Sequence, residues 1–190
     1  MNLEDISEVI QSRRSVVPNL FSEESIDKEI IEQLLKNAHT APNHKKTRPW
    51  RFLVFSGDSR VKLSDYLANH YKLNTPVEKQ SEIQQKKISE KPLKSFCSIA
   101  IVMHRDPDES LPEWEEVAAV ACAVQNLWLS ATAAGLAGFW ATPKAMLEAN
   151  EFLGLKENER CLGVFYLGKP ASLPAIPDRG DYAAHVTWME

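Results

Sequence analysis

The feature that most limits the fold of this chain is a long apolar run from Trp114 to Pro143. Between Val117 and Ala134 the run consists of Ala, Val, Leu, Cys and Trp, and its only polar breaks are Gln125, Asn126, Ser130 and Thr132. Because no face of such a helix is clearly solvated, we expect it to be buried in a core. The Gly-Phe-Trp sequence after Gly135 then predicts a short extended segment.

A membrane span is the alternative for this run, since its length is close to the lower limit for crossing a bilayer. Alanine is only weakly apolar, however, and the polar breaks fall in the middle of the run. Glu113, Glu115 and Glu116 flank one end, and no Lys/Arg cluster anchors either side. We therefore expect a core helix and no membrane association.

Composition limits the class of protein. A chain of 190 residues with 44% hydrophobic and 25% charged residues fits one soluble domain spanning 1–190, or one protomer of an interlocked dimer. The net charge of -4 argues against nucleic acid, although local arginines can still hold a small anion. The three scattered cysteines and five histidines show no metal-ligand spacing, so we expect no metal. The N-terminus lacks a secretory pattern, which favours the cytoplasm.

Helices precede the first strand. Apolar residues at helical spacing from Leu3 to Ile10 predict an amphipathic helix that ends near Arg13, before Pro18. A second helix, from Ile26 to His39, has Ser25 as its expected cap. A basic loop at 41–49 leads into a predicted strand at 50–55, which is rich in aromatic and β-branched residues.

Further strands are predicted at 98–104 and 161–167, and the first of these is apolar enough to be buried on both faces. Helices are predicted from Asp58 to about Tyr71 and from Thr142-Pro143 to Gly154. Since the helices and strands alternate irregularly, we expect an α+β sheet flanked by helices rather than a doubly wound parallel sheet. There is no Gly-rich phosphate loop, so arginines would have to hold any phosphate.

Two segments differ from the rest of the chain. Residues 72–94 are rich in Lys, Glu, Gln and Ser, with Pro76 and Pro92 as brackets, which predicts a solvated and mobile helical excursion. Residues 171–190 combine prolines with large apolar side chains, so we expect an arm that packs on another surface rather than a free tail.

Few residues stand out as carriers of chemistry. Arg13, Arg14 and Ser15 offer two guanidinium forks and a hydroxyl, which suit a phosphate monoester, although arginines at a helix end can equally be solvated. His44 in the basic loop could donate to a ligand or be an ordinary loop histidine. No Ser/His/Asp triad and no acid, base or nucleophile can be assigned, so we expect no catalytic side chain.

Taken together, the order of these motifs resembles the nitroreductase family of flavoproteins, and most closely its short bacterial branch. The resemblance runs from Asn2 to Pro170 and rests on five features. They are R-R-S after the first helix, A-P-N-H-x-x-x-R-P-W-x-F before the first strand, the Ala-rich helix, G-x-x-G-F-W-A-T-P, and Y-L-G-K-P.

This resemblance implies an FMN-binding homodimer. Its fold would be an α+β three-layer sandwich, in which helices flank a mainly antiparallel sheet. The two flavin sites would lie at the subunit interface, and the long helix would form much of that interface. The arm at 171–190 would pack on the partner subunit.

The resemblance also implies site residues. FMN contacts carried over by position are Arg13, Arg14, Ser15, Asn43, His44, Trp140, Ala141, Thr142, Gly168 and Lys169. The stretch that matches the nicotinamide nucleotide contacts is Ser130, Ala131, Thr132, Ala133, Ala134 and Gly135. In two places the chain departs from the family: Val16, Val17, Pro18 and Asn19 follow R-R-S where a further arginine often occurs, and Thr40 replaces a basic residue.

The activity implied is NAD(P)H-dependent hydride transfer, through FMN, to a small acceptor such as a nitroaromatic or a quinone. The absence of an acid-base pair agrees with this activity because the cofactor carries the chemistry. Relatives specialise in dehalogenation, enal reduction or flavin cleavage, and a non-catalytic flavin- or ligand-binding dimer is the alternative from another class.

Overall fold

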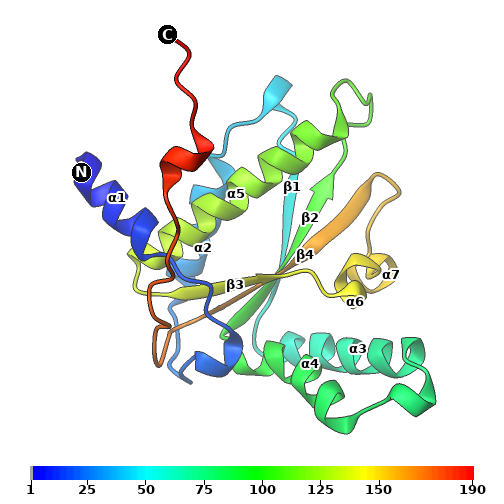
Figure 1. Cartoon of the computed structure of the whole chain (residues 1–190). Coiled ribbons are helices and arrows are strands. Elements are labelled where there is room, and N and C mark those ends of the chain that lie inside the picture. The colour runs from blue at the N-terminus through cyan, green and yellow to red at the C-terminus, as the bar shows by residue number, and fades with distance from the viewer. Residues whose placement is uncertain (1) are drawn as a thin grey trace.

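The structure, a computed structural model, describes residues 2–190 and has three layers (Figure 1). Its middle layer is one antiparallel sheet with the strand order β1-β2-β4-β3. The strands are β1 (Trp50–Phe55), β2 (Cys97–His104), β3 (Ala137–Ala141) and β4 (Glu159–Gly168). This arrangement confirms the predicted α+β fold with an antiparallel sheet between helices.

Helices cover both faces of the sheet, with α2 and α5 over one face and α3 and α4 across the other (Figure 1). The α-helices are α1 (Leu3–Ser12), α2 (Lys28–His39), α3 (Ser59–Asn74), α4 (Glu82–Lys94), α5 (Glu113–Ala133), α6 (Lys144–Leu147) and α7 (Asn150–Leu153). Short 3-10 turns are η1 (Pro18–Leu20), η2 (His44–Lys46), η3 (Val77–Lys79) and η4 (Tyr182–His185). No helix among residues 2–190 has the length and apolarity needed to cross a bilayer.

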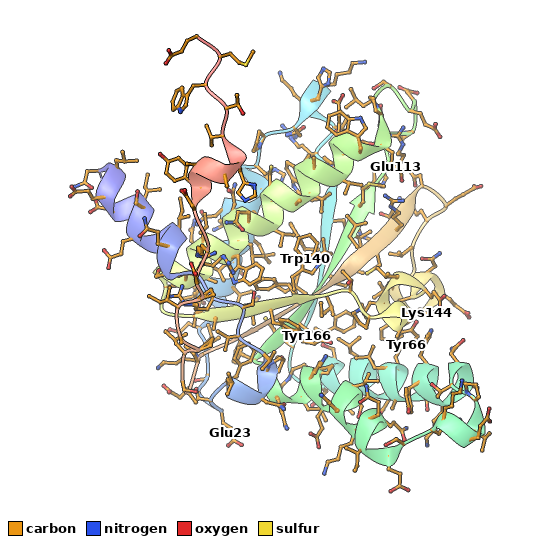
Figure 2. The ribbon with its side chains drawn as sticks, in the orientation of Figure 1. Glu23, Tyr66, Glu113, Trp140, Lys144 and Tyr166 are labelled. Atoms are coloured by element: carbon orange, nitrogen blue, oxygen red, sulfur yellow. The ribbon has the colours of Figure 1, made fainter. Side chains whose placement is uncertain are left out.

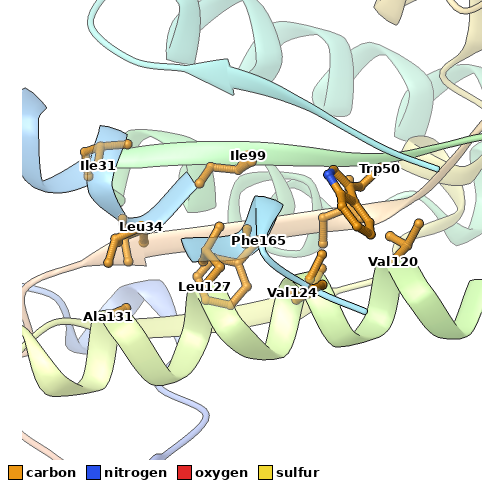
Figure 3. Packing of buried hydrophobic residues seen from close by; sticks show 14 of the residues in the cluster. Ile31, Leu34, Trp50, Ile99, Val120, Val124, Leu127, Ala131 and Phe165 are labelled. Atoms are coloured by element: carbon orange, nitrogen blue, oxygen red, sulfur yellow. The ribbon is translucent and has the colours of Figure 1, made fainter. Parts of the chain in front are cut away.

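The helix α5 is the predicted Ala-rich helix, and one side of it packs onto the sheet and onto α2 (Figure 3). Its buried residues recur at helical spacing: Glu116, Ala119, Val120, Ala123, Val124, Leu127 and Ala131. The helix ends because Gly135 takes a φ of +72°, and the Leu136 N–H then donates to the Ala131 carbonyl at 2.8 Å.

The opposite side of α5 is open in the single chain. Trp114 is 69% exposed, and Ala118, Cys122 and Gln125 are also exposed. The prediction that no face of this helix is solvated is therefore wrong for one chain. The sequence alone could not reveal this, because it does not distinguish an apolar residue that its own chain buries from one that a second copy would bury.

The second face of the sheet packs on α3, α6 and α7 through a separate cluster that includes Leu63, Leu67, Met146 and Tyr166. Residues 72–94 form the last turn of α3, η3 and α4. The expectation that Pro92 brackets this segment is wrong, since it lies buried inside α4, two residues before the last residue of that helix, Lys94. Proline has no N–H to donate to the Ile88 carbonyl, and the helix ends within the next turn.

Other boundaries also shift. The second helix begins at Lys28 rather than Ile26, and its N-cap is Asp27 instead of Ser25. The helix predicted after Thr142 is two short helices, α6 and α7, with Pro143 rather than Thr142 as the first N-cap. Gly154 ends α7 as predicted, with a φ of +60°.

The C-terminal segment 171–190 is exposed along its whole length. It runs beside α1 and then away from the sheet (Figure 1). Leu173, Ile176, Tyr182 and Trp188 are each more than 60% exposed. An arm this apolar buries little in its own chain.

Candidate functional site

Arg13 stands at the centre of a cluster of guanidinium groups. It is the C-cap residue of α1, and its guanidinium lies 4.5 Å from the centroid of the Trp128 ring. Its Nη1 is buried without a hydrogen-bond partner, and Arg179 Nη2 donates to the Arg13 carbonyl at 3.2 Å. Burial and the nearby charges of Arg179 and Arg14 lower the pKa of Arg13. Within residues 2–190 no carboxylate forms an ion pair with any of these three arginines, so the cluster suits an anion.

Arg14 has a different position from Arg13. Its Nη1 donates to the carbonyls of Gln11, Ser12 and Arg13 at 2.7, 2.6 and 3.1 Å, so it caps the C-terminus of α1. Only 9% of the residue is exposed, and its Nε has no partner among the described residues. The structure therefore gives Arg14 a structural task beside any contact with a ligand.

Ser15 connects the arginines to the edge strand β3. It forms a parallel bridge with Gly138, and the Val16 N–H donates to the Gly138 carbonyl at 3.0 Å. Backbone groups alternate along a strand, so the N–H and C=O of Trp140 point to the same outer edge of the sheet. Trp140 lies two residues beyond Gly138, about 7 Å along the strand. The fold thus brings the R-R-S motif (13–15) and the W-A-T motif (140–142) together along one edge of the sheet.

The side chains of the W-A-T motif differ in exposure. The Trp140 ring is partly buried, and its Nε1 donates to the Leu162 carbonyl at 3.2 Å (Figure 2). Ala141 is intermediate and Thr142 is exposed. The rigid ring thus fixes the strand, and the backbone edge and Thr142 remain available to a ligand.

Gly163 is a residue that the sequence did not point to. It has a φ of +121°, and a Cβ added there would lie 2.5 Å from the Ala141 carbonyl oxygen and 2.9 Å from Trp140 Nε1. It sits in β4 where the register with β2 shifts. Only glycine permits this close approach, so Gly163 sets the position of the W-A-T segment.

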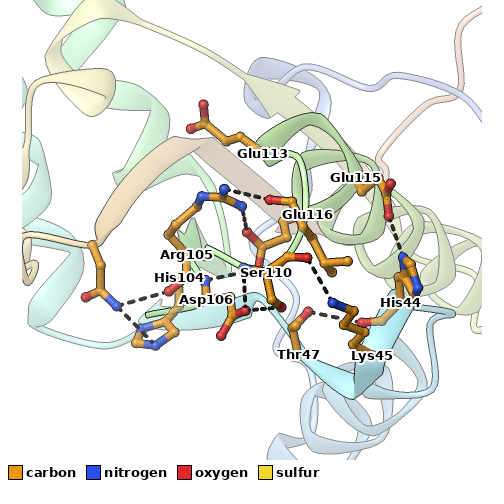
Figure 4. A network of polar contacts seen from close by, with 12 residues as sticks. His44, Lys45, Thr47, His104, Arg105, Asp106, Ser110, Glu113, Glu115 and Glu116 are labelled. Carbon is orange, nitrogen blue, oxygen red and sulfur yellow. Dashed lines mark hydrogen bonds and ion pairs between the residues drawn. The ribbon is translucent and has the colours of Figure 1, made fainter. Parts of the chain in front are cut away.

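The basic loop is tied to the start of α5 (Figure 4). His44 Nδ1 lies 2.8 Å from Glu115 Oε2, and Lys45 Nζ donates to the Ser110 carbonyl at 3.0 Å. Asn43 Oδ1 accepts from the Arg48 N–H at 3.1 Å. Lys45, Lys46 and Arg48 have φ values of +49°, +58° and +47°, a strained region for residues with side chains. Such strain is typical of loops that are held in one shape for function.

The loop and the arginine cluster are far apart in one chain. His44 contacts α5 at Glu115, whereas Arg13 contacts it at Trp128. The separation of thirteen positions between these contacts corresponds to about 20 Å of helix. The structure therefore does not bring Asn43 and His44 together with the R-R-S motif within a single chain.

The stretch from Ser130 to Gly135 closes α5. Ser130 Oγ accepts from Asn37 Nδ2 at 2.8 Å, and Ala131 is fully buried, so both face the interior. Thr132 Oγ1 donates to the Trp128 carbonyl at 3.0 Å. Ala133, Ala134 and Gly135 are exposed, and these three positions are the ones open to a nucleotide.

Gly168 is the last residue of β4, and Lys169 follows it. The Lys169 ammonium pairs with Glu24, and a Cβ at Gly168 would lie 2.5 Å from the Phe21 ring. Thr40, the second departure from the family pattern, donates from Oγ1 to the Asn37 carbonyl at 2.7 Å and so caps the end of α2. Within one chain the Lys169 and Thr40 side chains bond to Glu24 and to the Asn37 carbonyl, and neither bonds to the arginine cluster.

Two of the three cysteines, Cys97 and Cys161, are buried, whereas Cys122 on α5 is exposed. Burial raises the pKa of Cys97 to about 12 and that of Cys161 to about 11, so neither thiol forms a thiolate near neutral pH. No group of three or more His, Cys, Asp or Glu residues in 2–190 could hold a metal ion.

Comparison with known proteins agrees with the order of the motifs. The model of the Nitroreductase family matches residues 10–169, which include Arg13 and Arg14 of the arginine cluster, the basic loop, α5 and the W-A-T segment, but not Arg179. The chain belongs to the nitroreductase family. A Bacillus subtilis family member named "Putative NAD(P)H nitroreductase YfhC" is 28% identical over 177 residues, covering 92% of this chain and 89% of its own.

Solved structures give the same family fold. A nitroreductase-like family protein from Bacillus cereus superposes with a TM-score of 0.85 at 27% identity, covering 100% of this chain and 98% of its own. A Desulfovibrio desulfuricans nitroreductase-type structure in complex with FMN has a TM-score of 0.74 at 22% identity, covering 100% and 98%. The predicted nitroreductase-like α+β sandwich is thereby confirmed.

Proposed function

We propose that this chain is an FMN-dependent NAD(P)H oxidoreductase that passes hydride to a small organic acceptor, such as a nitroaromatic or a quinone, in the cytoplasm. The observation that carries the proposal is the cluster of Arg13, Arg14 and Arg179, which has no carboxylate partner among residues 2–190 and lies beside the open edge of β3. Family membership and the FMN in the Desulfovibrio relative support it.

The residues present fit FMN. Arg13 and Arg179 would hold the phosphate, because a buried Nη1 without a partner on Arg13 needs an acceptor. Ser15 and Arg14 would line the phosphate end of the FMN site. The outward N–H of Trp140 and the exposed Thr142 would face the ring system, where backbone donors stabilise added negative charge. Ala133, Ala134 and Gly135, the exposed end of the stretch, would meet the nicotinamide nucleotide.

FMN supplies the two-electron chemistry when it is bound. The chain would bind and orient it, exclude water with the Trp140 ring and the apolar residues of α5, and hold the donor and acceptor in turn. No side chain in this account moves a proton by itself, which agrees with the lack of an assigned acid or base.

We also propose that the functional unit is a homodimer. The exposed face of α5, the uncovered apolar residues of α1 and the arm at 171–190 are all surfaces that a second copy would bury. In an antiparallel pairing of two α5 helices, the His44 loop of one chain would approach the Arg13 cluster of its partner. Asn43 and His44 would then complete a site that one chain leaves incomplete.

A stable dimer is therefore the first expected result. Light scattering at low micromolar concentration should give twice the 21.4 kDa chain mass. Deleting 175–190 should weaken the dimer, because each large apolar side chain loses about 1.5 to 3 kcal/mol of burial. A variant with Lys62→Gln, an exposed position on α3, is the control and should dimerise as the parent does. A folded monomer of the parent chain would contradict the proposal.

Steady-state kinetics test the function. We expect NAD(P)H oxidation that depends on an added nitroaromatic or quinone, since the flavin needs an acceptor to turn over. A non-catalytic flavin-binding dimer would bind FMN yet show no acceptor-dependent rate, and that outcome would replace the proposal. Reductive dehalogenation is the second candidate, because an iodotyrosine deiodinase from Haliscomenobacter hydrossis is 30% identical over 189 aligned residues, covering 86% of this chain.

Residues 72–94 are proposed to cover the acceptor side of the site. Lys91 Nζ lies 5.7 Å from the Phe139 ring centroid, so α4 reaches the strand that carries Trp140. In this proposal the segment is a surface element that adjusts the access of the acceptor to the flavin, while the sheet and its helices form a rigid scaffold.

A further inference from the structure

A cavity of about 210 Å³ lies on the second face of the sheet, away from α5. It is walled by α3, α4, the start of α6 and β4. Its polar lining residues are His70, Tyr71, Asn74, Thr75, Lys91, Lys144 and Tyr166, and its apolar ones are Leu67, Ile88, Pro143 and Ala145. Two ammonium groups line the cavity, and Glu148 outside the lining pairs with that of Lys144, so the positive charge of Lys91 remains.

Lys91 is the cation at the inner wall. Its side chain is half-buried, and among residues 2–190 its ammonium forms no ion pair. Its one recorded contact is with the Phe139 ring, 5.7 Å from the centroid. Burial and the nearby charge of Lys87 lower the pKa of Lys91, so the ammonium lacks the solvation and the counter-ion that a lysine usually has.

Tyr166 supplies a hydroxyl to the same cavity. The residue is only 1% exposed, and its ring lies 6.4 Å from that of Phe139 in a stacked arrangement. Its hydroxyl has no hydrogen-bond partner within the described part of the chain, although buried tyrosine hydroxyls usually find one. Figure 2 shows Tyr166 and Lys144 on the side of the sheet that faces α3 and α4.

The other charged groups at the cavity are already occupied. His70 Nε2 lies 3.0 Å from Glu148 Oε2, and Lys144 Nζ lies 3.5 Å from Glu148 Oε1. Tyr71 and Thr75 add partly buried hydroxyls to the lining. Among the lining residues the one ammonium without a counter-ion is that of Lys91, and the most deeply buried hydroxyl is that of Tyr166. That pair matches the two oxygens of a single carboxylate.

We propose that this cavity binds the carboxylate of a small organic acid, with the Lys91 ammonium as its counter-ion and the Tyr166 hydroxyl as a hydrogen-bond donor. The walls of Leu67, Ile88 and Pro143 take the apolar body of the acid. A phosphate dianion fits less well, because it carries more charge and more acceptors than these two groups satisfy. Binding of the acid uses neither flavin nor nucleotide, so this proposal would remain if the flavin proposal failed, although Lys91 belongs to the segment 72–94 that is proposed above to cover the acceptor side.

Calorimetric titration of the purified full-length protein with benzoate tests the proposal, and benzamide serves as the neutral ligand of the same shape. We expect benzoate to bind, and Lys91→Gln and Tyr166→Phe each to weaken it by about tenfold, the usual cost of one charge-assisted contact. Benzamide should bind more weakly than benzoate to the parent and should not respond to Lys91→Gln. Lys62→Gln removes the same charge from α3 outside the cavity and should leave both ligands unchanged.

Three results would overturn the proposal. Benzoate affinity that is the same in Lys91→Gln and in the parent would place any bound acid elsewhere, including in the flavin site. An equal loss of benzamide affinity in Lys91→Gln would show that the carboxylate is not what Lys91 recognises. Inorganic phosphate that binds more tightly than benzoate and is lost in the same variants would make the cavity a phosphate site instead.

Discussion

Arg13→Ala is expected to weaken FMN binding by about thirty- to a thousand-fold, which corresponds to roughly 2 to 4 kcal/mol. The physical reason is that the Arg13 guanidinium is buried against Trp128 with an Nη1 that has no partner in the protein. An anion bound there gains a charge-assisted hydrogen bond in a partly desolvated place. Fluorescence titration of the apoprotein with FMN measures the change.

The fold should survive this substitution. Without an anion, Arg13, Arg14 and Arg179 repel one another, so removing one charge relieves repulsion and offsets the loss of the contact with Trp128. Arg179→Ala should also weaken FMN binding, whereas Arg160→Ala, at the far end of the sheet and paired with Glu113, should not. If Arg13→Ala binds FMN as the parent does, the arginine cluster is not the phosphate site.

Phe165→Ala is expected to lower the free energy of unfolding by about 3 to 5 kcal/mol, the usual cost of removing a fully buried aromatic ring. The ring packs edge-on against Trp128, with 5.2 Å between centroids, and Trp128 in turn supports Arg13. Denaturant unfolding at one fixed protein concentration measures the loss. Val54→Ala, on the edge strand β1 and 39% exposed, is the control and should cost far less.

A second substitution makes this test more specific. A Cβ at Gly138 would lie 2.0 Å from Phe165 Cζ, so Gly138→Ala alone should destabilise the protein by overpacking. Combined with Phe165→Leu it should cost less than the sum of the two single changes, because the ring that collides is gone. If the losses in the free energy of unfolding were strictly additive, Gly138 would not pack against the Phe165 ring.

Patterns within one element were predictable from the sequence. The Ala-rich run identified α5, and β-branched or apolar runs identified β1, β2 and β4. These signals depend on the spacing at which apolar residues recur within one helix or strand, and neighbouring residues determine that spacing. The short β3 appeared only as an extended segment, since its five residues are too few for a clear alternation.

Contacts between distant segments were not predictable in the same way. Arg179 reaches Arg13 from 166 positions away, and nothing in the arm distinguishes it from a solvated arginine. Gly163 was missed because its role depends on Ala141 and Trp140 across the ladder. Lys91 looked like one of many surface lysines, although the packing of α4 on α3 and the contact with the Phe139 ring leave it partly buried.

The central proposal, that this family member binds FMN and transfers hydride through it, can be tested by one anaerobic experiment. NADH or NADPH is added to the purified protein while the flavin absorbance band is followed, and a nitroaromatic or quinone is added afterwards. The account predicts a yellow protein whose band is bleached by the nicotinamide nucleotide and returns with the acceptor. A protein that cannot be loaded with FMN, or a flavin band that neither nucleotide bleaches, would contradict it.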